Sequence, residues 1–357
     1  MACIGCEVVP SLPQGDIRLY LAPKLAHTRA VAARGLRDAG WIVEDIDGAV
    51  LVVKVADGQS ATLLDDLDQV MTSPEQSNCP AVMLDPGQPF GIRQLADTTP
   101  LRVLIARQKS AWLSELLTDE RLEMHFQPIL HADGGGVFAF ESLVRGIGAD
   151  GKRIPPNDLF GAAREADLLF HLDRAARVAA IRQAHGAQID ETLFINFNPT
   201  SVYEPSFCLK TTFDAVNAIG TCPANYVFEV VETDHISDHG HLKNILAEYR
   251  NHGFRIALDD LGAGYSSLNL LQGIRPDFVK LDREMVDGVS GSRYLASITS
   301  RLISMARELD VQLIAEGIEN REDWEWLQEQ GVDYVQGFYF ARPSATPERP
   351  AMADLAR

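Results

Sequence analysis

Residues 255–262 read RIALDDLG and residues 278–282 read FVKLD. Each is a short apolar run, typical of a buried strand in a parallel sheet, and each ends in charged residues. Six further runs follow the same plan: MHFQPI, FAFESLVR, LFINFNP, VFEVVET, LIAEGIE and VQGFYFARP. The polar residues at the ends of the eight runs are Gln127, Glu141, Asn196, Glu229, Asp259 with Asp260, Lys280, Glu316 and Gln336. A charged residue fits poorly in a core, so the pattern predicts strand ends that converge on one site, as at the C-terminal rim of a barrel enzyme.

From about residue 119 onward, the apolar runs alternate with stretches of helical character. These helical stretches lie at 157–185, 200–219, 239–252, 284–308 and 321–330. Alternating strands and helices predict a parallel sheet, and eight strands predict a closed barrel. The strands at 124–130 and 136–144 are joined only by HADGGG, whereas a parallel crossover needs a dozen or more residues. The predicted fold class is therefore α/β, a modified TIM (β/α)8 barrel with one antiparallel strand.

The first third of the chain has a different organisation, a small α+β domain before the barrel. We predict a strand at 16–21, a helix at 24–39, a hairpin at 41–55 that turns at Asp47-Gly48, a helix at 61–73 and a strand at 81–85. Residues 100–117 are expected to begin as a strand and become a connecting helix. The expected domains are a regulatory α+β domain at 1–110, the barrel at 111–345 and an irregular tail at 346–357. The N-terminal domain has no recognisable catalytic constellation.

Composition limits the classes of partner. The 357 residues include 50 acidic and 32 basic residues, for a net charge of −18, which argues against a face that binds duplex nucleic acid. An anionic small ligand remains compatible if metal ions mediate the contact. We expect no membrane span and no secretion signal, because the chain has no apolar stretch of sufficient length and no basic region before an apolar one. Five cysteines are too few for a disulfide scaffold, so a reducing cytoplasm is expected.

Cys3 and Cys6 form a C-x-x-C pair near the N-terminus. The pair could be half of a zinc site or a redox pair. A zinc site needs two more ligands, for which Cys79 and His27 are the candidates. The alternative is two reduced cysteines without a metal.

The residue types at the strand ends indicate a particular metal. Glu141, Asn196, Glu229 and Asp259 offer hard oxygen ligands, which suit Mg²⁺ or Mn²⁺ better than zinc. In a regular strand Asp259 and Asp260 would point to opposite faces, so the backbone must bend for both to face the site. So placed, they could hold two cations about 3.5–4 Å apart.

Two further features lie beside these carboxylates. Lys280 could orient an attacking water or neutralise developing charge, or it could be a structural counterion. After the Asp pair comes GAGYSSL at 262–268, a candidate mobile flap in which Ser266 or Ser267 can cap the following helix.

Eight segments carry a resemblance to a known family: FQPI, ESLVR, NFNP, FEVVE, DDLGAGYSSL, KLD, AEGIE and QGFYFARP, in this order. Over about residues 119–345 the chain resembles the EAL-domain family of cyclic-di-GMP phosphodiesterases. The resemblance implies a modified TIM barrel, hydrolysis of cyclic di-GMP to linear pGpG with Mg²⁺ or Mn²⁺, and a homodimer formed through the barrel. The motif that names the family reads Glu141-Ser142-Leu143 here.

The resemblance also implies roles for individual residues. Glu141, Asn196, Glu229 and Asp259 resemble the ligands of a first metal, and Asp259 with Asp260 those of a second. Lys280 and Glu316 resemble the residues that position or deprotonate the water, supported by Gln336. Glu232 resembles the residue that tethers the loop after the Asp pair. Gln127, Leu143, Arg145 and Asp282 resemble substrate contacts.

Two positions depart from the family pattern. Ser142 stands where alanine is usual, and because serine is also small we expect tuned rather than abolished activity. Leu261 stands where phenylalanine is usual, which weakens the expectation of coupling through the loop. The alternatives to an enzyme are a silent cyclic-di-GMP receptor and a sensor-adaptor that uses the barrel as a binding surface. The chain has no GGDEF-like signature, so no cyclase activity is expected.

Overall fold

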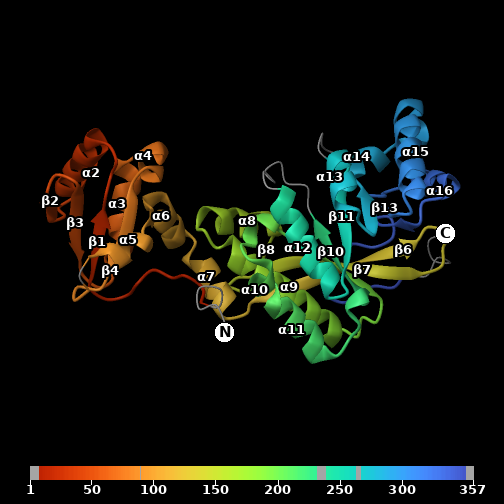
Figure 1. Ribbon diagram of the computed structural model, residues 1–357, viewed down its shortest axis with the longest axis horizontal. Coiled ribbons are helices and arrows are strands. Elements are labelled where there is room, and N and C mark those ends of the chain that lie inside the picture. The colour runs from red at the N-terminus through yellow and green to blue at the C-terminus, as the bar shows by residue number, and fades with distance from the viewer. Residues whose placement is uncertain (1–7, 89, 231–238, 263–266, 351–357) are drawn as a thin grey trace. The chain divides into compact units, whose positions relative to one another are not determined.

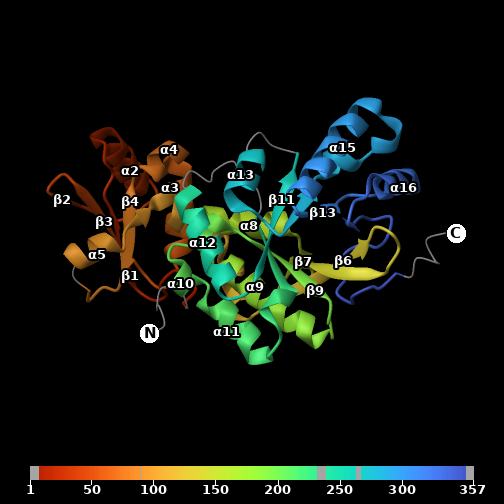
Figure 2. The same cartoon turned by 45° about the vertical axis from the view of Figure 1, so that its right-hand side comes forward.

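The computed structural model describes residues 8–88, 90–230, 239–262 and 267–350, with only the helical backbone described at 267–269. Contacts divide the chain into two compact units. The first holds Glu7–Glu120 together with Asn157–Leu172, and the second holds Arg121–Pro156 and the residues from Asp173 onward. Figures 1 and 2 show the two units in two views. The domain limits at residues 110 and 345 remain predictions.

The first unit is built on a five-stranded sheet with the order β2-β3-β1-β4-β5. Its strands are β1 (Ile17–Leu21), β2 (Val43–Ile46), β3 (Val50–Val55), β4 (Pro80–Leu84) and β5 (Thr99–Pro100). The helices are α2 (Ala26–Asp38), α3 (Ser60–Val70), α4 (Ser73–Ser77), α5 (Ile92–Ala96), α6 (Leu101–Lys109) and α7 (Ala111–Thr118). Leu19, Leu36, Leu67 and Leu104 belong to one buried core, so α2, α3 and α6 cover one face of the sheet.

Two local predictions in this unit had different outcomes. The predicted turn at Asp47-Gly48 is confirmed: both residues adopt positive φ, 51° and 65°, and the N–H of Ala49 donates to the carbonyl of Ile46 at 3.0 Å, as in a tight β-turn. The expectation that residues 100–117 begin as a strand is largely wrong, because β5 ends at Pro100 and α6 begins at Leu101. Leu101, Leu104 and Ile105 are buried at helical spacing, so core packing favours a helix there.

The second unit is a closed barrel, which confirms the predicted fold class. Its strands are β6 (Leu122–His131), β7 (Val137–Ile147), β9 (Thr192–Phe197), β10 (Tyr226–Val230), β11 (Arg255–Leu261), β12 (Phe278–Leu281), β13 (Gln312–Ala315) and β14 (Tyr334–Val335). A short strand, β8 (Arg153–Ile154), extends the sheet beside β7. β6 pairs antiparallel with both β7 and β14, while β7 and β9 to β14 run parallel. β6 is the predicted antiparallel strand.

Helices accompany the barrel strands, but three of the predicted helical stretches, 157–185, 200–219 and 284–308, are interrupted. The helices are α8 (Pro156–Glu165), α9 (Leu169–Gly186), α10 (Pro205–Cys208), α11 (Lys210–Ile219), α12 (His239–Asn251), α13 (Ser267–Ile274), α14 (Arg283–Val286), α15 (Arg293–Glu308) and α16 (Arg321–Gln330), with 3₁₀ turns η1 (Pro199–Ser201), η2 (Pro223–Asn225) and η3 (Val289–Gly291). The stretch at 157–185 divides where Asp167 adopts a φ of 56°, and the stretch at 284–308 divides at Gly288, with a φ of 76°. Left-handed residues end helices because they cannot continue the right-handed path.

The barrel interior is layered, and this layering positions the site. One buried layer takes one residue from each of the eight main strands: Ile129, Ala139, Phe194, Val227, Ala257, Phe278, Ile314 and Tyr334. Side chains two residues apart on a strand share a face. Two residues further toward the rim stand Gln127, Glu141, Asn196, Glu229, Asp259, Lys280, Glu316 and Gln336, which we call the polar layer. An apolar floor thus supports the polar layer, as the sequence pattern predicted.

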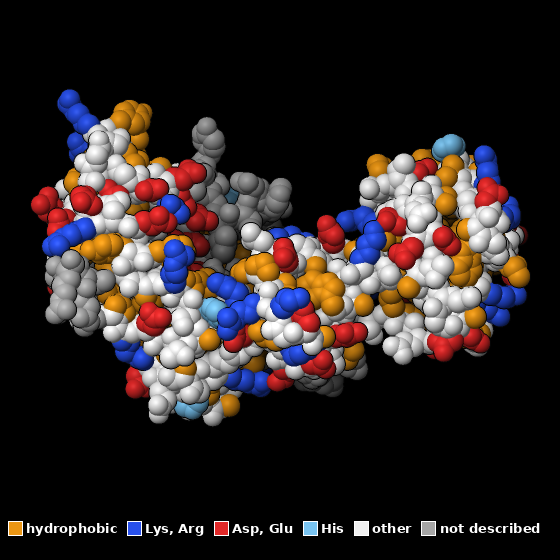
Figure 3. Space-filling view, turned by 180° about the vertical axis from the view of Figure 1, so that it is seen from behind, with side chains coloured by type: hydrophobic (Ala, Val, Ile, Leu, Met, Phe, Trp, Pro, Cys, Tyr) orange, Lys and Arg blue, Asp and Glu red, His pale blue; other side chains and the backbone are white. Residues whose placement is uncertain are grey.

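The outer surface carries charges of both signs. Figure 3 shows acidic and basic side chains interspersed over one face of the molecule. Within the part of the chain that the structure describes, no helix is long and apolar enough to cross a membrane.

Candidate functional site

Lys280 is the central cation of the polar layer. Its side chain, from β12, is only 1% exposed. Its Nζ atom lies 2.5 Å from Glu316 Oε1, 2.9 Å from Glu229 Oε1, 3.3 Å from Glu141 Oε2 and 3.7 Å from Asp259 Oδ1. Burial alone would lower the pKa of Lys280, but these carboxylates outweigh it and hold the pKa well above its usual value. The lysine therefore stays charged.

The carboxylate of Glu141 is held in place by amide side chains. Asn196 Nδ2 donates to Glu141 Oε1 at 3.0 Å, and Gln336 Nε2 donates to Glu141 Oε2 at 2.7 Å. Gln336 also donates to Gln127 Oε1 at 3.2 Å. Burial would raise the pKa of Glu141, but Lys280 and the two amide donors outweigh burial and lower it. Glu141 is therefore ionised and fixed in orientation.

The end of β11 bends so that both aspartates reach the same side. The pairing of β11 with β12 shifts register between Leu258 and Leu261, and Asp260 adopts a φ of 56°. Its N–H donates to Asp259 Oδ1 at 3.0 Å. One oxygen each of Asp259, Asp260 and Glu316 lie within 4.8 Å of one another. This is the bend that two adjacent aspartates need to face one site, and the same geometry brings Glu316 within reach of a shared cation.

Burial, and then the crowding of like charges, raises the pKa values of Asp260 and Glu316. Burial, followed by Asp259 and Asp282, raises the pKa of Asp260 to about 7. Burial also raises the pKa of Glu316 to about 8; Lys280 opposes this shift, and Asp259 and Glu141 add to it. The site thus carries more carboxylates than its one ammonium group neutralises.

Glu229 provides the strongest indication of a bound cation. It is 0% exposed, and neither of its carboxylate oxygens has a hydrogen-bond partner among the described residues. Oε1 lies 2.9 Å from Lys280 Nζ without hydrogen-bond alignment. Burial raises the pKa of Glu229 well above its usual value. A buried carboxylate without a hydrogen bond is costly unless a cation lies beside it. Lys280 is such a cation, but it is shared with Glu141, Asp259 and Glu316, so one positive charge faces four carboxylates. The oxygen donors present would fit an additional Mg²⁺ or Mn²⁺.

The predicted substrate contacts lie near the polar layer. Leu143 and Arg145 follow Glu141 on the same face of β7, and both are half-buried. Arg145 Nη1 donates to the carbonyl of Val144 at 2.8 Å. Asp282 caps α14 by accepting from the N–H of Glu284 at 2.7 Å.

Several predicted residues cannot be located. Glu232 and residues 263–266 of the candidate flap lie outside the described residues, as do Cys3 and Cys6. Cys79, a candidate zinc ligand, is buried, and burial raises the pKa of its thiol to about 12. Such a thiol is a poor source of the thiolate that zinc binds.

The two departures from the family pattern are both buried. Ser142 is 4% exposed, and its hydroxyl donates to the carbonyl of Phe194 on β9 at 2.8 Å. Glu141 and Ser142 point to opposite faces of β7, so Ser142 lies outside the polar layer. Leu261 is 0% exposed. The serine therefore links two barrel strands instead of adding a polar group beside Lys280.

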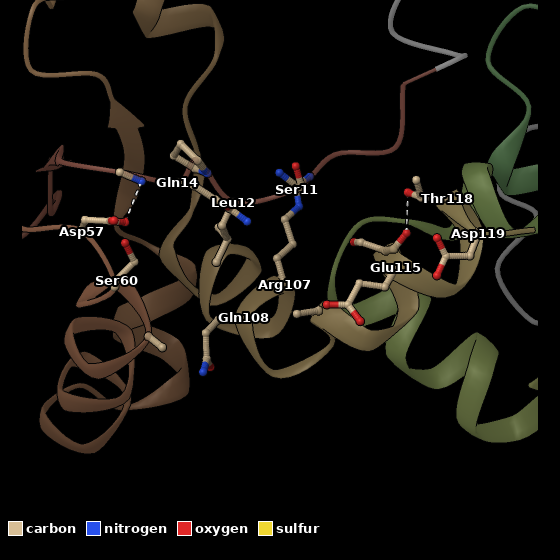
Figure 4. A pocket seen from close by; sticks show the side chains of 16 residues that line it. Ser11, Leu12, Gln14, Asp57, Ser60, Arg107, Gln108, Glu115, Thr118 and Asp119 are labelled. Carbon is tan, nitrogen blue, oxygen red and sulfur yellow. Dashed lines mark hydrogen bonds between the residues drawn. The ribbon is translucent and has the colours of Figure 1, made fainter. Parts of the chain in front are cut away.

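A separate pocket of about 680 Å³ lies within the first unit. It is lined by residues of the segment 11–15, the segment 57–61 and helices α6 and α7. Figure 4 shows Arg107 extending toward Ser11 there. Arg107 Nε donates to the carbonyl of Ala166 at 3.0 Å, and its Nη2 lies 3.6 Å from Asp167 Oδ2. None of the predicted site residues lines this pocket.

Fold and site together define a TIM-barrel protein whose polar site lies at the carboxyl ends of the parallel strands. Comparison with protein-family models matches residues 110–343 to the EAL domain. The chain therefore belongs to the EAL-domain family.

Curated relatives match through the same region. "Signaling protein YkoW" of Bacillus subtilis (strain 168) is 30% identical over 234 residues, 65% of this chain and 29% of that protein. "Probable cyclic di-GMP phosphodiesterase PdeB" of Escherichia coli (strain K12) is 27% identical over 234 residues, 64% of this chain and 44% of that protein. The chain thus spans less than half the length of these relatives.

Solved structures extend the likeness. A standalone EAL protein from Vibrio cholerae O395, in its c-di-GMP-bound form, matches with a TM-score of 0.59 and 30% identity, over 66% of this chain and 98% of that one. The manganese/cy-diGMP complex of Klebsiella pneumoniae BlrP1 matches with a TM-score of 0.57 and 23% identity, over 92% of this chain and 96% of that one. The second match shows a likeness of fold alone, and it reaches into the N-terminal unit.

Proposed function

We propose that this chain hydrolyses cyclic di-GMP to linear pGpG with the help of Mg²⁺ or Mn²⁺. The observation that carries the proposal is the surplus of carboxylates around Lys280: Glu229 is buried without a hydrogen bond, and oxygens of Asp259, Asp260 and Glu316 cluster within 4.8 Å of one another. Membership of the EAL-domain family, with relatives named as cyclic di-GMP phosphodiesterases, supports the same activity.

The metal ligands in this proposal come from the polar layer and from Asp260, which follows Asp259 in the sequence. Glu141, Asn196, Glu229 and Asp259 would hold one cation, and Asp259 with Asp260 would hold a second. Glu316 lies close enough to the aspartates to contribute. When bound, Mg²⁺ or Mn²⁺ supplies Lewis-acid stabilisation of the phosphoryl oxygens and lowers the pKa of water.

Lys280 and Glu316 would handle the attacking water. Their side chains form an ion pair with 2.5 Å between Nζ and Oε1, which fixes both groups for hydrogen bonds to one water. The charged Lys280 would orient the water and stabilise negative charge on the phosphate. Glu316, which pairs with Lys280 and lies beside Asp259 and Asp260, would accept the proton of the attacking water. Gln336 would keep Glu141 in its orientation.

Substrate contacts would come from Gln127, Leu143, Arg145 and Asp282, with Glu232 tethering the loop after the Asp pair. Arg145 suits a phosphate because its guanidinium can donate two parallel hydrogen bonds. The acidic site would then bind a dianion through its cations. This reconciles the net charge of −18 with a nucleotide substrate.

The alternatives are a silent cyclic-di-GMP receptor and a sensor-adaptor. The test is pGpG formation by the purified full chain with Mg²⁺ or Mn²⁺, with and without a chelator, beside cyclic-di-GMP binding. Metal-dependent product supports the enzyme. Binding without product supports the receptor, and neither binding nor product supports the adaptor.

We further propose a cytoplasmic homodimer formed through the barrel, with a regulatory N-terminal domain at 1–110, the phosphodiesterase barrel at 111–345 and a tail at 346–357. The contacts of Arg107 with Ala166 and Asp167 support the regulatory role. Segment 157–172 packs with the N-terminal unit, yet it follows β7, the strand that carries Glu141.

A further inference from the structure

A buried ion pair lies outside the polar layer, within the helices that surround β9 and β10. Asp173 and Arg177, both on α9, are 2% and 0% exposed, and Arg177 Nη1 donates to Asp173 Oδ2. Arg177 Nε donates to Thr212 Oγ1 on α11 at 3.2 Å. A buried pair of this kind contributes little net stability, since desolvation offsets its attraction. The role of the pair must therefore be sought in the other groups that it contacts.

The carboxylate of Asp173 holds the chain just beyond the end of β9. Its Oδ1 accepts from the backbone N–H of Asn198 at 2.8 Å. Its Oδ2 lies 2.9 Å from the hydroxyl of Ser201, whose one proton is shared between this oxygen and the carbonyl of Asn198 at 2.7 Å. Asn198 follows Asn196, the polar-layer residue of β9, by two positions. The backbone that leaves the site is thus fixed by a charged acceptor in a dry environment, where such hydrogen bonds are strong.

Tyr249 of α12 connects the same region to β10. Its ring stacks on Phe228 with centroids 4.1 Å apart and contacts Phe197 at 5.2 Å. Phe197 and Phe228 are the neighbours in sequence of Asn196 and Glu229, and these two polar residues lie side by side in register. Burial raises the pKa of Tyr249 to about 12, and the charge of Arg177 partly opposes this increase. The phenol of Tyr249 is therefore close enough to Arg177 to interact with its charge.

We propose that the Asp173–Arg177 pair is a positioning device for the metal site: through Asn198 and Ser201 it sets the end of β9 and so places the side chain of Asn196 beside Glu141 and Glu229. This inference rests on the proposed metal site. Asp173 and Arg177 are positioning residues, since neither belongs to the polar layer.

The test compares two double variants of the full chain. In Asp173→Leu/Arg177→Met both charges are replaced by apolar groups of similar size, a change that buried ion pairs often tolerate in stability. In Asp173→Asn/Arg177→Met the charges are also removed, but an oxygen remains to accept from Asn198. The probe is Mn²⁺ alone, with binding followed by electron paramagnetic resonance and folding by circular dichroism.

The leucine double variant should bind Mn²⁺ about 10-fold more weakly. Mutating residues that support metal ligands typically weakens metal binding about 10–100-fold, so this is a loss near the lower limit. The asparagine double variant should stay within about threefold of wild type. Gln183→Met is the matched control. Gln183 lies on the same helix but accepts from the N–H of Met124 and donates to the carbonyl of Leu122, near the start of β6. Its loss should reduce stability without changing Mn²⁺ affinity.

If either double variant fails to fold, Ser201→Ala, which removes one hydrogen bond to Asp173, should still weaken Mn²⁺ binding by about threefold, near the lower end of what one hydrogen bond contributes. Equal Mn²⁺ affinity in wild type and the folded leucine variant would overturn the proposal, as would equal affinity in Ser201→Ala. If wild type bound Mn²⁺ but formed no pGpG, the proposed activity would fail while the positioning result stood.

Discussion

The Nζ atom of Lys280 lies 2.9 Å from Oε1 of Glu229, and both side chains are buried in the barrel. The Nζ atom of Lys280 also lies within 4.0 Å of three other carboxylates, so one positive charge is shared among four carboxylates. The remaining negative charge requires either protons or metal cations. The behaviour of the site with pH and with metal follows from this relationship.

Replacing Lys280 by methionine should abolish most turnover while preserving metal binding. Methionine keeps much of the apolar stem, but it removes the cation that we assign to orienting the water. Loss of one such group typically lowers a rate about 10²–10³-fold. We expect pGpG formation, measured by chromatography at saturating Mg²⁺, to fall at least about 100-fold, and Mn²⁺ to bind at least as tightly as in wild type. A rate within threefold of wild type would contradict the assignment.

Without metal, the barrel should become less stable as the pH rises. The pKa values of Asp260 and Glu316 are raised from 3.8 and 4.5 to about 7 and 8. Between about pH 5 and 8, therefore, the folded protein holds protons that the unfolded chain has released, so the free energy of unfolding falls with increasing pH. The titration of Glu141 affects the free energy of unfolding only below this pH range, because the pKa of Glu141 is lowered from 4.5.

Thermal unfolding in EDTA, followed from pH 5 to 8, measures this decline. Mg²⁺ should remove most of this decline, because the deprotonated carboxylates are the proposed ligands. Asp260→Asn should flatten the decline in EDTA. An unchanged melting temperature across the window, with and without Mg²⁺, would contradict the crowded-carboxylate description.

Restoring alanine at position 142 should affect stability more clearly than rate. The hydroxyl of Ser142 donates to the carbonyl of Phe194 and points away from the polar layer. Its loss should reduce the free energy of unfolding by about 1 kcal/mol, and the rate should change about tenfold or less, equivalent to about 1.4 kcal/mol in the barrier. Denaturant titration and pGpG formation measure the two effects. A gain of several orders of magnitude in Ser142→Ala would identify the serine as a silencing change.

Loosening the attachment of segment 157–172 should alter the rate without altering ligand affinity. Arg107→Met keeps an apolar stem but loses the hydrogen bond to Ala166 and the ion pair with Asp167. We expect at least a twofold change in turnover at saturating substrate, and cyclic-di-GMP binding by calorimetry within twofold of wild type. Arg102→Met, at an exposed position of the same helix, is the control. If Arg107→Met and Arg102→Met behaved alike, the segment would not transmit a signal from the N-terminal domain.

The sequence alone predicted the barrel fold and the residues that form the polar layer. Strand side chains alternate between faces, and a polar residue two positions beyond an apolar inward residue, as Glu141 follows Ala139, necessarily points inward as well. The short HADGGG connection likewise determined the direction of β6.

Long-range partners could not be predicted in the same way. Asp173 and Arg177 have the spacing of an ordinary surface pair on a helix, and only the packing of α11 and α12 buries them. The hydrogen bond donated by the Ser142 hydroxyl depends on the register between β7 and β9, which decides that the carbonyl of Phe194 lies beside it. The break at Asp167 depends on a left-handed residue without a glycine to mark it.

The most direct test of hydrolysis against mere binding is a single-turnover experiment. Wild-type protein in excess over cyclic di-GMP is mixed with Mg²⁺ or Mn²⁺, and bound nucleotide and product are measured in the same sample. Glu141→Gln, which loses a proposed metal ligand, is the control and should react at least about 100-fold more slowly, since losing even an outer partner costs 10–100-fold. Our account predicts that wild type converts all of the nucleotide to pGpG, and that EDTA stops conversion. Recovery of intact cyclic di-GMP from a tight wild-type complex with metal present would contradict it.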